Sequence, residues 1–398
     1  MRRCNCRGGW RRRRGSNSEQ RRGLPLIWAV LLVHMFKSKT CFVIGAGASH
    51  ELDLPIGNGL TADIAKLINI EADYGFPLKK GDPQIYQILQ MLHRKPEWKD
   101  SKFLLSGREL AEAMELAPSI DTFLQTHRDN AEYRILGKLG IAQAILKAER
   151  KCKLHASNGG PVRYRDIANT WYVSLAQHLF SGIPADSPAS AFDNVSFIVF
   201  NYDRCLEVFL IRAVSVYFRI PQSEAQKIVS NVAILHPYGS IGPLDDFGPE
   251  SAVFGDNEAD LVAVTQRILT FSESVQDDDL VQNTKRLIRE SETLVFLGFA
   301  FHEQNMDLLG DELPKQEKKS AVRRVYATTY GMSASDTQVV KAQIAHLLRG
   351  RPQKERDDYT IEMFPGKCCD LFAEYWRSLS ASAETQSSIR RYNMEVLG

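Results

Sequence analysis

The chain has 398 residues, of which 44 % are hydrophobic and 25 % charged, and this is the usage of an ordinary globular protein with one large or two ordinary domains. Residues 1–40 carry nine Arg and two Lys against Glu19 alone, whereas the rest of the chain carries 39 basic and 47 acidic side chains. Because the body is mildly acidic, we expect no direct nucleic-acid binding. Seven cysteines without Cys-x-x-Cys spacing argue against a disulfide framework and indicate a reducing, cytoplasmic compartment.

The first 38 residues form a separate segment, in which an Arg-rich stretch precedes the apolar run Leu24–Val33. This order is typical of a signal peptide, but no small-x-small cleavage site follows before the first predicted strand. The run is also shorter than the roughly 20 residues of a membrane-spanning helix. We therefore expect a basic and apolar extension that is either disordered or untranslated, with translation starting at Met35, and no association with a membrane. A targeting signal is the alternative.

A run of small residues follows the apolar stretch Cys41–Ile44 and precedes Leu54-Pro55 and the helical pattern of Leu60–Leu67. It consists of Gly45, Ala46, Gly47, Ala48 and Ser49. Without Cβ interference, backbone N–H groups between a strand and a helix can approach an anionic ligand. The run therefore predicts a phosphate or pyrophosphate site, and a tight turn without a ligand is the alternative.

Five more apolar runs of strand length follow, separated by helical patterns: Val195–Phe200, Asn231–Leu235, Thr293–Leu297, Arg324–Thr329 and Tyr359–Phe364. Continuous apolarity is typical of strands that are covered on both faces. Helical spacing occurs in Leu206–Phe218, Asp279–Glu290, Ser335–Leu348 and Asp370–Leu379. We predict an α/β fold with a doubly wound, mostly parallel, Rossmann-like sheet.

The long stretch from about 70 to 191 has a different character, being mixed and charged. Its helical candidates are Pro83–Leu92, Arg108–Leu116, Ala131–Lys151 and Trp171–Leu179. We expect a helical insertion between the first and second strands, and a second, irregular excursion over 245–280. The predicted organisation is an extension (1–38), a ligand-binding domain (39–310) and a C-terminal part (311–398) that completes the sheet or forms an assembly surface.

Polar and glycine residues follow three of the predicted strands: Asn201-Tyr202-Asp203, the segment His236–Ser240, and Gly298–Phe301. In open α/β sheets ligands bind beyond the carboxyl ends of the strands, so we expect these groups to converge with the glycine run. Each has a structural alternative: Asn201 as a helix cap, His236 as a satisfied histidine and Gly298 as a turn.

Taken in order, these segments resemble the sirtuin-like superfamily, and more closely its bacterial branch of antiphage NAD-consuming enzymes. The resemblance rests on Gly45–Ser49 with Leu54-Pro55, Phe200–Asp203, His236–Ser240, and Gly298–Phe301 with Asn305, and Ser119–Leu124 matches a further recurring pattern. It covers roughly residues 40 to 310.

The resemblance implies NAD+ as the substrate and assigns roles by position. Asn201 would orient the nicotinamide ribose and the attacking group, His236 would act as base, and Asp203 would support Asn201. The other implied NAD-binding residues are Gly45, Ala46, Gly47, Ala48, Ser49, Pro55, Asp121, Gly239, Ser240, Gly298, Phe299 and Asn305, with Gly298 and Asn305 on the adenosine side.

The chain departs from deacylating sirtuins in two respects. It lacks the two Cys-x-x-Cys units of their zinc module, so we expect no metal and no acyl-lysine groove. Pro237 and Tyr238 also separate His236 from Gly239, where deacylases usually run directly from His to Gly.

Our principal hypothesis is an NAD+ glycohydrolase, in which Asn201 holds water or ribose hydroxyls and His236 accepts a proton. A non-catalytic sensor of NAD or ADP-ribose that signals to a partner is the main alternative. A nicotinamide-dependent oxidoreductase, with Glu71 or Asp73 on the adenosine ribose, is a third. Uncontrolled NAD consumption would kill the host, so the resemblance implies control through a homo-oligomer or a companion ATPase, nuclease-like or sensor protein.

Overall fold

The computed structural model describes residues 36–72, 78–93, 100–155, 162–244, 253–310, 321–348 and 359–382. Within them lies one six-stranded sheet with the order β3-β2-β1-β4-β5-β6, in which every pairing is parallel. The strands are β1 (Thr40–Ile44), β2 (Val195–Val199), β3 (Ile234–Leu235), β4 (Thr293–Leu297), β5 (Arg324–Thr328) and β6 (Thr360–Phe364). The predicted α/β class is confirmed, and the sheet is wholly rather than mostly parallel.

Strand β1 lies between β2 and β4, with Ile44 opposite Val199 on one side and Leu297 on the other. The sheet continues from β1 through β2 to β3, and the chain then crosses back to β4 on the far side of β1. The carboxyl ends of β1, β2 and β4 therefore meet where the winding direction reverses, and in such sheets this is the usual place for a ligand.

Alternate residues of each central strand point into two separate cores. Cys41 and Val43 of β1 join one core, whereas Phe42 and Ile44 join the other, and all four are at most 1 % exposed. The first core includes residues of α12 (Asp278–Glu290), α13 (Glu303–Leu309) and α14 (Ala334–Leu347). The second includes α7 (Trp171–Phe180), α8 (Cys205–Phe218), α9 (Gln222–Ser230) and α15 (Cys368–Glu374). Burial on both faces explains why the strands are continuously apolar.

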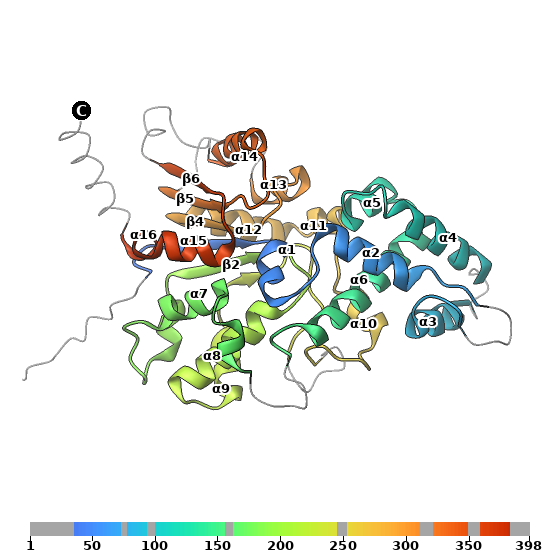
Figure 1. Ribbon diagram of the computed structural model, residues 1–398, viewed down its shortest axis with the longest axis horizontal. Coiled ribbons are helices and arrows are strands. Elements are labelled where there is room, and N and C mark those ends of the chain that lie inside the picture. The colour runs from blue at the N-terminus through green and yellow to red at the C-terminus, as the bar shows by residue number, and fades with distance from the viewer. Residues whose placement is uncertain are drawn as a thin grey trace, which may run out of the picture. The chain divides into compact units, whose positions relative to one another are not determined.

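The stretch between β1 and β2 is helical, as predicted. It holds α1 (Ala46–Ser49), α2 (Gly57–Ile68), α3 (Pro83–His93), α4 (Asp100–Ala113), α5 (Ile120–Thr126), α6 (Ala131–Lys151) and α7, with short 3₁₀ helices at His50–Leu52, Tyr164–Ile167 and Pro188–Phe192. Helices α2 to α6 are grouped together to the right of the strands in Figure 1. Their apolar residues extend the first core beyond the sheet.

Four elements differ from the sequence-based expectation. The helix predicted over Arg108–Leu116 begins earlier, at Asp100, and ends at Ala113. The third strand is only two residues long, because the N–H groups of Asn231 and Val232 bond back to α9. The excursion over 245–280 is not wholly irregular: it contains α10 (Leu261–Thr265), capped by the Asp260 carboxylate, and α11 (Phe271–Gln276), which starts with a capping box. The predicted helix Asp370–Leu379 is divided at Tyr375 into α15 and α16 (Trp376–Ser380).

Glu51 ties the segment after the glycine run to two distant helices. Its carboxylate accepts the backbone N–H of Trp171 at 2.7 Å and that of Cys369 at 2.9 Å, in the first turns of α7 and α15. Carboxylates are favourable at helix N-termini, where N–H groups lack partners within the helix. Trp171 also donates its indole N–H to the carbonyl oxygen of Ala48 at 3.0 Å.

The predicted extension lies outside the described residues except for its last three positions. Of these, Phe36 is 3 % exposed and lies edge-on to Phe42, with ring centroids 5.6 Å apart. Its carbonyl oxygen accepts a hydrogen bond from the side chain of Asn194. No helix among the described residues is long and apolar enough to cross a membrane.

Candidate functional site

A cavity of about 160 Å³ lies at the carboxyl ends of β1, β2 and β4. Nine of the residues singled out from the sequence line it: Gly45, Ala46, Ser49, Pro55, Asp121, Asn201, Asp203, Phe299 and Asn305. Gly47, Ala48, His236, Gly239, Ser240 and Gly298 are not among its lining residues. The structure thus brings most of the predicted groups together and places the others around them.

The glycines after β1 and β4 allow two loops to pack backbone against backbone. A Cβ added to Gly45 would lie 2.6 Å from the carbonyl oxygen of Gly298, and one added to Gly47 would lie 2.8 Å from the Cα of Gly298. Gly298 has a φ of +54°, and its own added Cβ would lie 2.1 Å from the nitrogen of Ala48. The N–H of Gly47 donates to the oxygen of Gly298 at 3.0 Å. A side chain at any of these three positions would collide with the backbone of the facing loop. The packing of the two loops therefore requires glycine there, independently of any ligand.

Asn201, directly after β2, is 6 % exposed and lines the cavity. Its Nδ2 donates to the carbonyl oxygen of Gly45 at 3.2 Å and to the hydroxyl oxygen of Ser49 at 2.9 Å. A carbonyl oxygen can only accept, so the Gly45 bond fixes which end of the carboxamide is the nitrogen. Its Oδ1 has no hydrogen-bond partner among the described residues. Asn201 therefore offers a buried, unused acceptor at the cavity.

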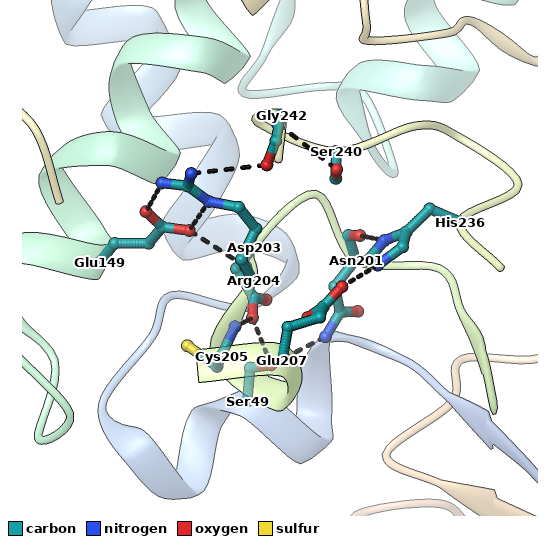
Figure 2. Close-up of polar contacts among 10 residues, drawn as sticks. All are labelled: Ser49, Glu149, Asn201, Asp203, Arg204, Cys205, Glu207, His236, Ser240 and Gly242. Carbon is teal, nitrogen blue, oxygen red and sulfur yellow. Dashed lines mark hydrogen bonds and ion pairs between the residues drawn. The ribbon is translucent and has the colours of Figure 1, made fainter. Parts of the chain in front are cut away.

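Asp203 continues this network behind Asn201. Its Oδ1 accepts the hydroxyl of Ser49 at 3.2 Å and the backbone N–H of Cys205 at 3.0 Å, at the start of α8 (Figure 2). The Ser49 hydroxyl also lies 3.3 Å from the hydroxyl of Tyr172. Burial raises the pKa of Asp203, although the Cys205 N–H opposes the shift. Asp203 thus holds Ser49, which in turn accepts from Asn201.

Asp121 lines the cavity from the insertion. Ser119 caps α5 by accepting the N–H of Thr122 at 3.1 Å, and this places Asp121 in the first turn. The hydroxyl of Tyr202 donates to Asp121 Oδ1 at 2.5 Å. Burial raises the pKa of Asp121, against the effect of the Tyr202 hydroxyl. A carboxylate from the insertion and the segment after β2 therefore meet at one cavity.

Asn305 and Phe299 line the cavity beyond β4. The Oδ1 of Asn305 accepts the hydroxyl of Tyr238 at 2.7 Å. Phe299 lies edge-on to Phe200, with ring centroids 5.0 Å apart.

His236 lies behind Asn201 and is held at both ring nitrogens. Its Nδ1 is 3.0 Å from the main-chain oxygen of Asn201, and its Nε2 is 2.7 Å from the carboxylate of Glu207 (Figure 2). Burial lowers the pKa of His236, but the Glu207 carboxylate, the main-chain oxygen of Asn201 and the charge of Asp203 together outweigh it, so the net shift is upward. Burial raises the pKa of Glu207, but His236, a backbone N–H and the charge of Arg204 together outweigh it, so the net shift is downward. The two side chains form an ion pair beside the cavity.

The residues after His236 shape a turn. Gly239 has a φ of +70°, and an added Cβ would lie 1.8 Å from the carbonyl oxygen of Arg267. Ser240 Oγ lies 3.5 Å from the backbone N–H of Gly242. Both residues therefore support the chain path next to the site.

A second ion pair connects this region with α6. Arg204 and Glu149 are 1 % and 0 % exposed, and Arg204 donates to the carboxylate through Nε at 3.1 Å and Nη2 at 2.6 Å. The backbone N–H groups of Arg204 and Gly255 donate to the same carboxylate at 3.0 and 3.1 Å. Neither member of the pair was singled out from the sequence, because nothing in the local pattern joins positions 149 and 204.

Several cavity residues had no role assigned from the sequence: Thr61, Thr122, Tyr202, Tyr238, His302 and Gln304. Tyr202 and Tyr238 lie inside the segments that were singled out, and His302 and Gln304 follow the same strand as Gly298. Ligands bind beyond the carboxyl ends of the strands in such sheets, and counting a few more residues after each strand would have included these four.

Comparison with known families gives one match. Residues 195–349 match the family described as a SIR2-like domain. The matched stretch begins at β2 and includes Asn201, His236 and Gly298, whereas the glycine run after β1 precedes it. The chain matches no curated protein. Over residues 195–349 the chain is therefore similar to a SIR2-like domain, and such a domain implies an activity related to NAD.

Proposed function

We propose that this chain is an NAD+ glycohydrolase, which cleaves the bond between nicotinamide and ribose to give nicotinamide and ADP-ribose. The observation that carries the proposal is the buried, unpartnered Oδ1 of Asn201 at the cavity. A buried acceptor without a partner costs about 1–3 kcal/mol, so a ligand hydroxyl or a water that donates to it is favoured. The SIR2-like match over the same residues supports NAD as the ligand.

The charge at the cavity suits this reaction. Nicotinamide leaves NAD+ as a neutral group from a cationic ring, so little acid catalysis is needed, and the site has to stabilise an oxocarbenium-like transition state and position a water. Asp121 and Asp203 line the cavity, and its described lining residues include no Lys or Arg. Carboxylates near a developing positive charge lower the barrier.

The proposal gives the remaining cavity residues binding roles. Gly45, Ala46, Ser49 and Pro55 would hold NAD on the β1 side, and Phe299 with Asn305 would hold it beyond β4. Gly47, Ala48, Gly239, Ser240 and Gly298 would keep the surrounding loops in place. No metal takes part in this scheme.

The biological setting we propose comes from the sequence resemblance. The resemblance to antiphage NAD-consuming enzymes supports depletion of cytoplasmic NAD during infection, as abortive defence. Such an activity needs control, which we assign to a homo-oligomer or to a companion ATPase, nuclease-like or sensor protein.

The test is nicotinamide release from NAD+ by the full chain and by Asn201→Ala, with NAD binding measured by calorimetry. We expect the parent to release nicotinamide and Asn201→Ala to lose at least about 100-fold in kcat, the scale on which a single preorganised polar group acts. Asn283→Ala, at an exposed position of α12, is the matched control and should keep full activity.

The same experiment distinguishes a non-catalytic NAD sensor, which one observation favours: both ring nitrogens of His236 are already engaged. Tight NAD binding without nicotinamide release, in the parent at all protein concentrations, would mean either a sensor or an enzyme that awaits its activating partner, and would direct the search to that partner. Unchanged release by Asn201→Ala would contradict the role that we give to Asn201.

A further inference from the structure

The ion pair behind Asn201 determines how many protons His236 carries. Its Nε2 faces a carboxylate oxygen of Glu207 and its Nδ1 faces the main-chain oxygen of Asn201. A main-chain oxygen never donates a hydrogen bond, and a carboxylate oxygen does not donate one while the group is ionised. With Glu207 ionised, both ring nitrogens donate, and the imidazole is then the doubly protonated cation.

The charges around the pair favour this state. Glu207, in the first turn of α8, faces His236 most directly, and Asp203 adds a second negative charge that favours the cation. Arg204 is the positive group near Glu207 and helps to keep its carboxylate ionised. The side chains of His236 and Glu207 are 11 % and 20 % exposed, so water screens their attraction only weakly.

The pair holds the main chain of Asn201, and neither His236 nor Glu207 is among the lining residues of the cavity. His236 holds the main-chain oxygen of Asn201, while Gly45 and Ser49 hold its Nδ2. With both ends held, the free Oδ1 has a fixed position. A charged donor also makes a stronger hydrogen bond to the Asn201 oxygen than a neutral imidazole does.

We propose that Glu207 is a positioning residue of this site, which keeps His236 as the cation that fixes Asn201. Charged rather than neutral His236 then supports catalysis, and His236 does not act as the base. This inference rests on the proposed function, because its kinetic readout is nicotinamide release.

The kinetic test compares the pH dependence of kcat in the full chain and in Glu207→Gln. If the cation is the active form, wild-type kcat falls as pH rises through the pKa of His236. Loss of the carboxylate lowers that pKa, so in Glu207→Gln the fall moves by roughly one pH unit or more toward lower pH. At a pH between the midpoints of the two profiles, Glu207→Gln should have a lower kcat than the wild type, whereas its KM should differ by less than about twofold. Glu224→Gln, at an exposed position of α9, is the matched control and should not change the profile.

The opposite sign would overturn the proposal. If His236 works as a neutral base, wild-type kcat rises with pH through that pKa, and Glu207→Gln moves the rise to lower pH and increases kcat there. An unchanged profile in Glu207→Gln would overturn it as well, because the carboxylate would then have no influence on His236.

A second measurement does not need activity. Titration of the His236 ring, followed by NMR of ¹⁵N-labelled histidine in the full chain, should give a lower pKa in Glu207→Gln than in the wild type. Equal values would overturn the pairing even if the chain cleaves NAD+. If the values differ but no variant releases nicotinamide, the proposed function fails together with the catalytic role of the cation, while the pairing stands. Circular dichroism establishes that the variant is folded.

Discussion

Arg204 and Glu207 lie three residues apart at the start of α8, and each belongs to a different ion pair (Figure 2). In the Arg204–Glu149 pair, two backbone N–H groups complete the bonding of the carboxylate, and both side chains are at most 1 % exposed. In the Glu207–His236 pair, Glu207 Oε2 is buried without a partner among the described residues. The first pair is saturated and the second keeps unused hydrogen-bonding capacity. We infer that the first serves stability and the second serves the site.

The largest effect should follow from breaking the saturated pair. Arg204→Met leaves the fully buried carboxylate of Glu149 without its cation, and such a loss costs about 3–5 kcal/mol of unfolding free energy. Urea denaturation at pH 7 measures it. Arg286→Met, in an exposed pair with Glu290 on α12, is the control and should change the free energy by less than about 0.5 kcal/mol. A loss below 1 kcal/mol in Arg204→Met would remove the distinction between the two pairs.

An intermediate effect should come from the loops around Asn201. Gly298→Ala would place a Cβ 2.1 Å from the nitrogen of Ala48 at a φ of +54°, and we expect a loss of about 2–3 kcal/mol from clash and backbone strain together. Gly331→Ala separates the two causes, since its φ is +79° but nothing lies within 4 Å of the added atom. It should lose only about 1 kcal/mol. Equal thermal shifts in both variants would show that loop packing contributes little.

The smallest effect, and the one most specific to the unsaturated pair, depends on pH. Because the pKa of His236 is raised, its stabilisation is complete below about 6.5 and disappears as pH rises through the folded-state value. Because the pKa of Glu207 is lowered, its stabilisation is complete above about 4.5 and disappears as pH falls through the folded-state value. The advantage of the wild type over Glu207→Gln should therefore peak between about pH 4.5 and 6.5, at about 1 kcal/mol. Denaturation curves at pH 5.5 and 9 measure it, and an advantage that grows toward pH 9 would contradict the ion pair.

The four inner strands could be predicted because β1, β2, β4 and β5 are buried at every position, and such strands are continuously apolar in sequence. The edge strands β3 and β6 are only partly buried. All six predicted positions agree with the structure to within a residue or two, except at β3. The order of the strands and the two ion pairs could not be predicted in the same way. They depend on partners such as Glu149 for Arg204, 55 residues away, and no local pattern carries that information.

Part of the candidate site could be predicted because its residues belong to short local motifs. Asn201 and Asp121 were singled out, and both lie at the cavity. The sequence explained Gly45 and Gly47 by close approach to a ligand, whereas the structure shows the backbone of Gly298 and Phe299 in the space that their Cβ atoms would need. A glycine in the sequence indicates that another group approaches the backbone closely, but the sequence does not show whether that group is a ligand or another part of the chain.

The bonds of Glu51 set a limit on when the site can form during synthesis. Its carboxylate receives an N–H from Trp171, 120 residues later, and another from Cys369, 318 residues later. Phe372 of the same helix stacks on Phe42 of the central strand. While the ribosome is still translating the middle of the chain, the segment after the glycine run therefore lacks half of these anchors. The contacts around this segment can therefore be completed only after residues as far as α15 (Cys368–Glu374) have emerged from the ribosome.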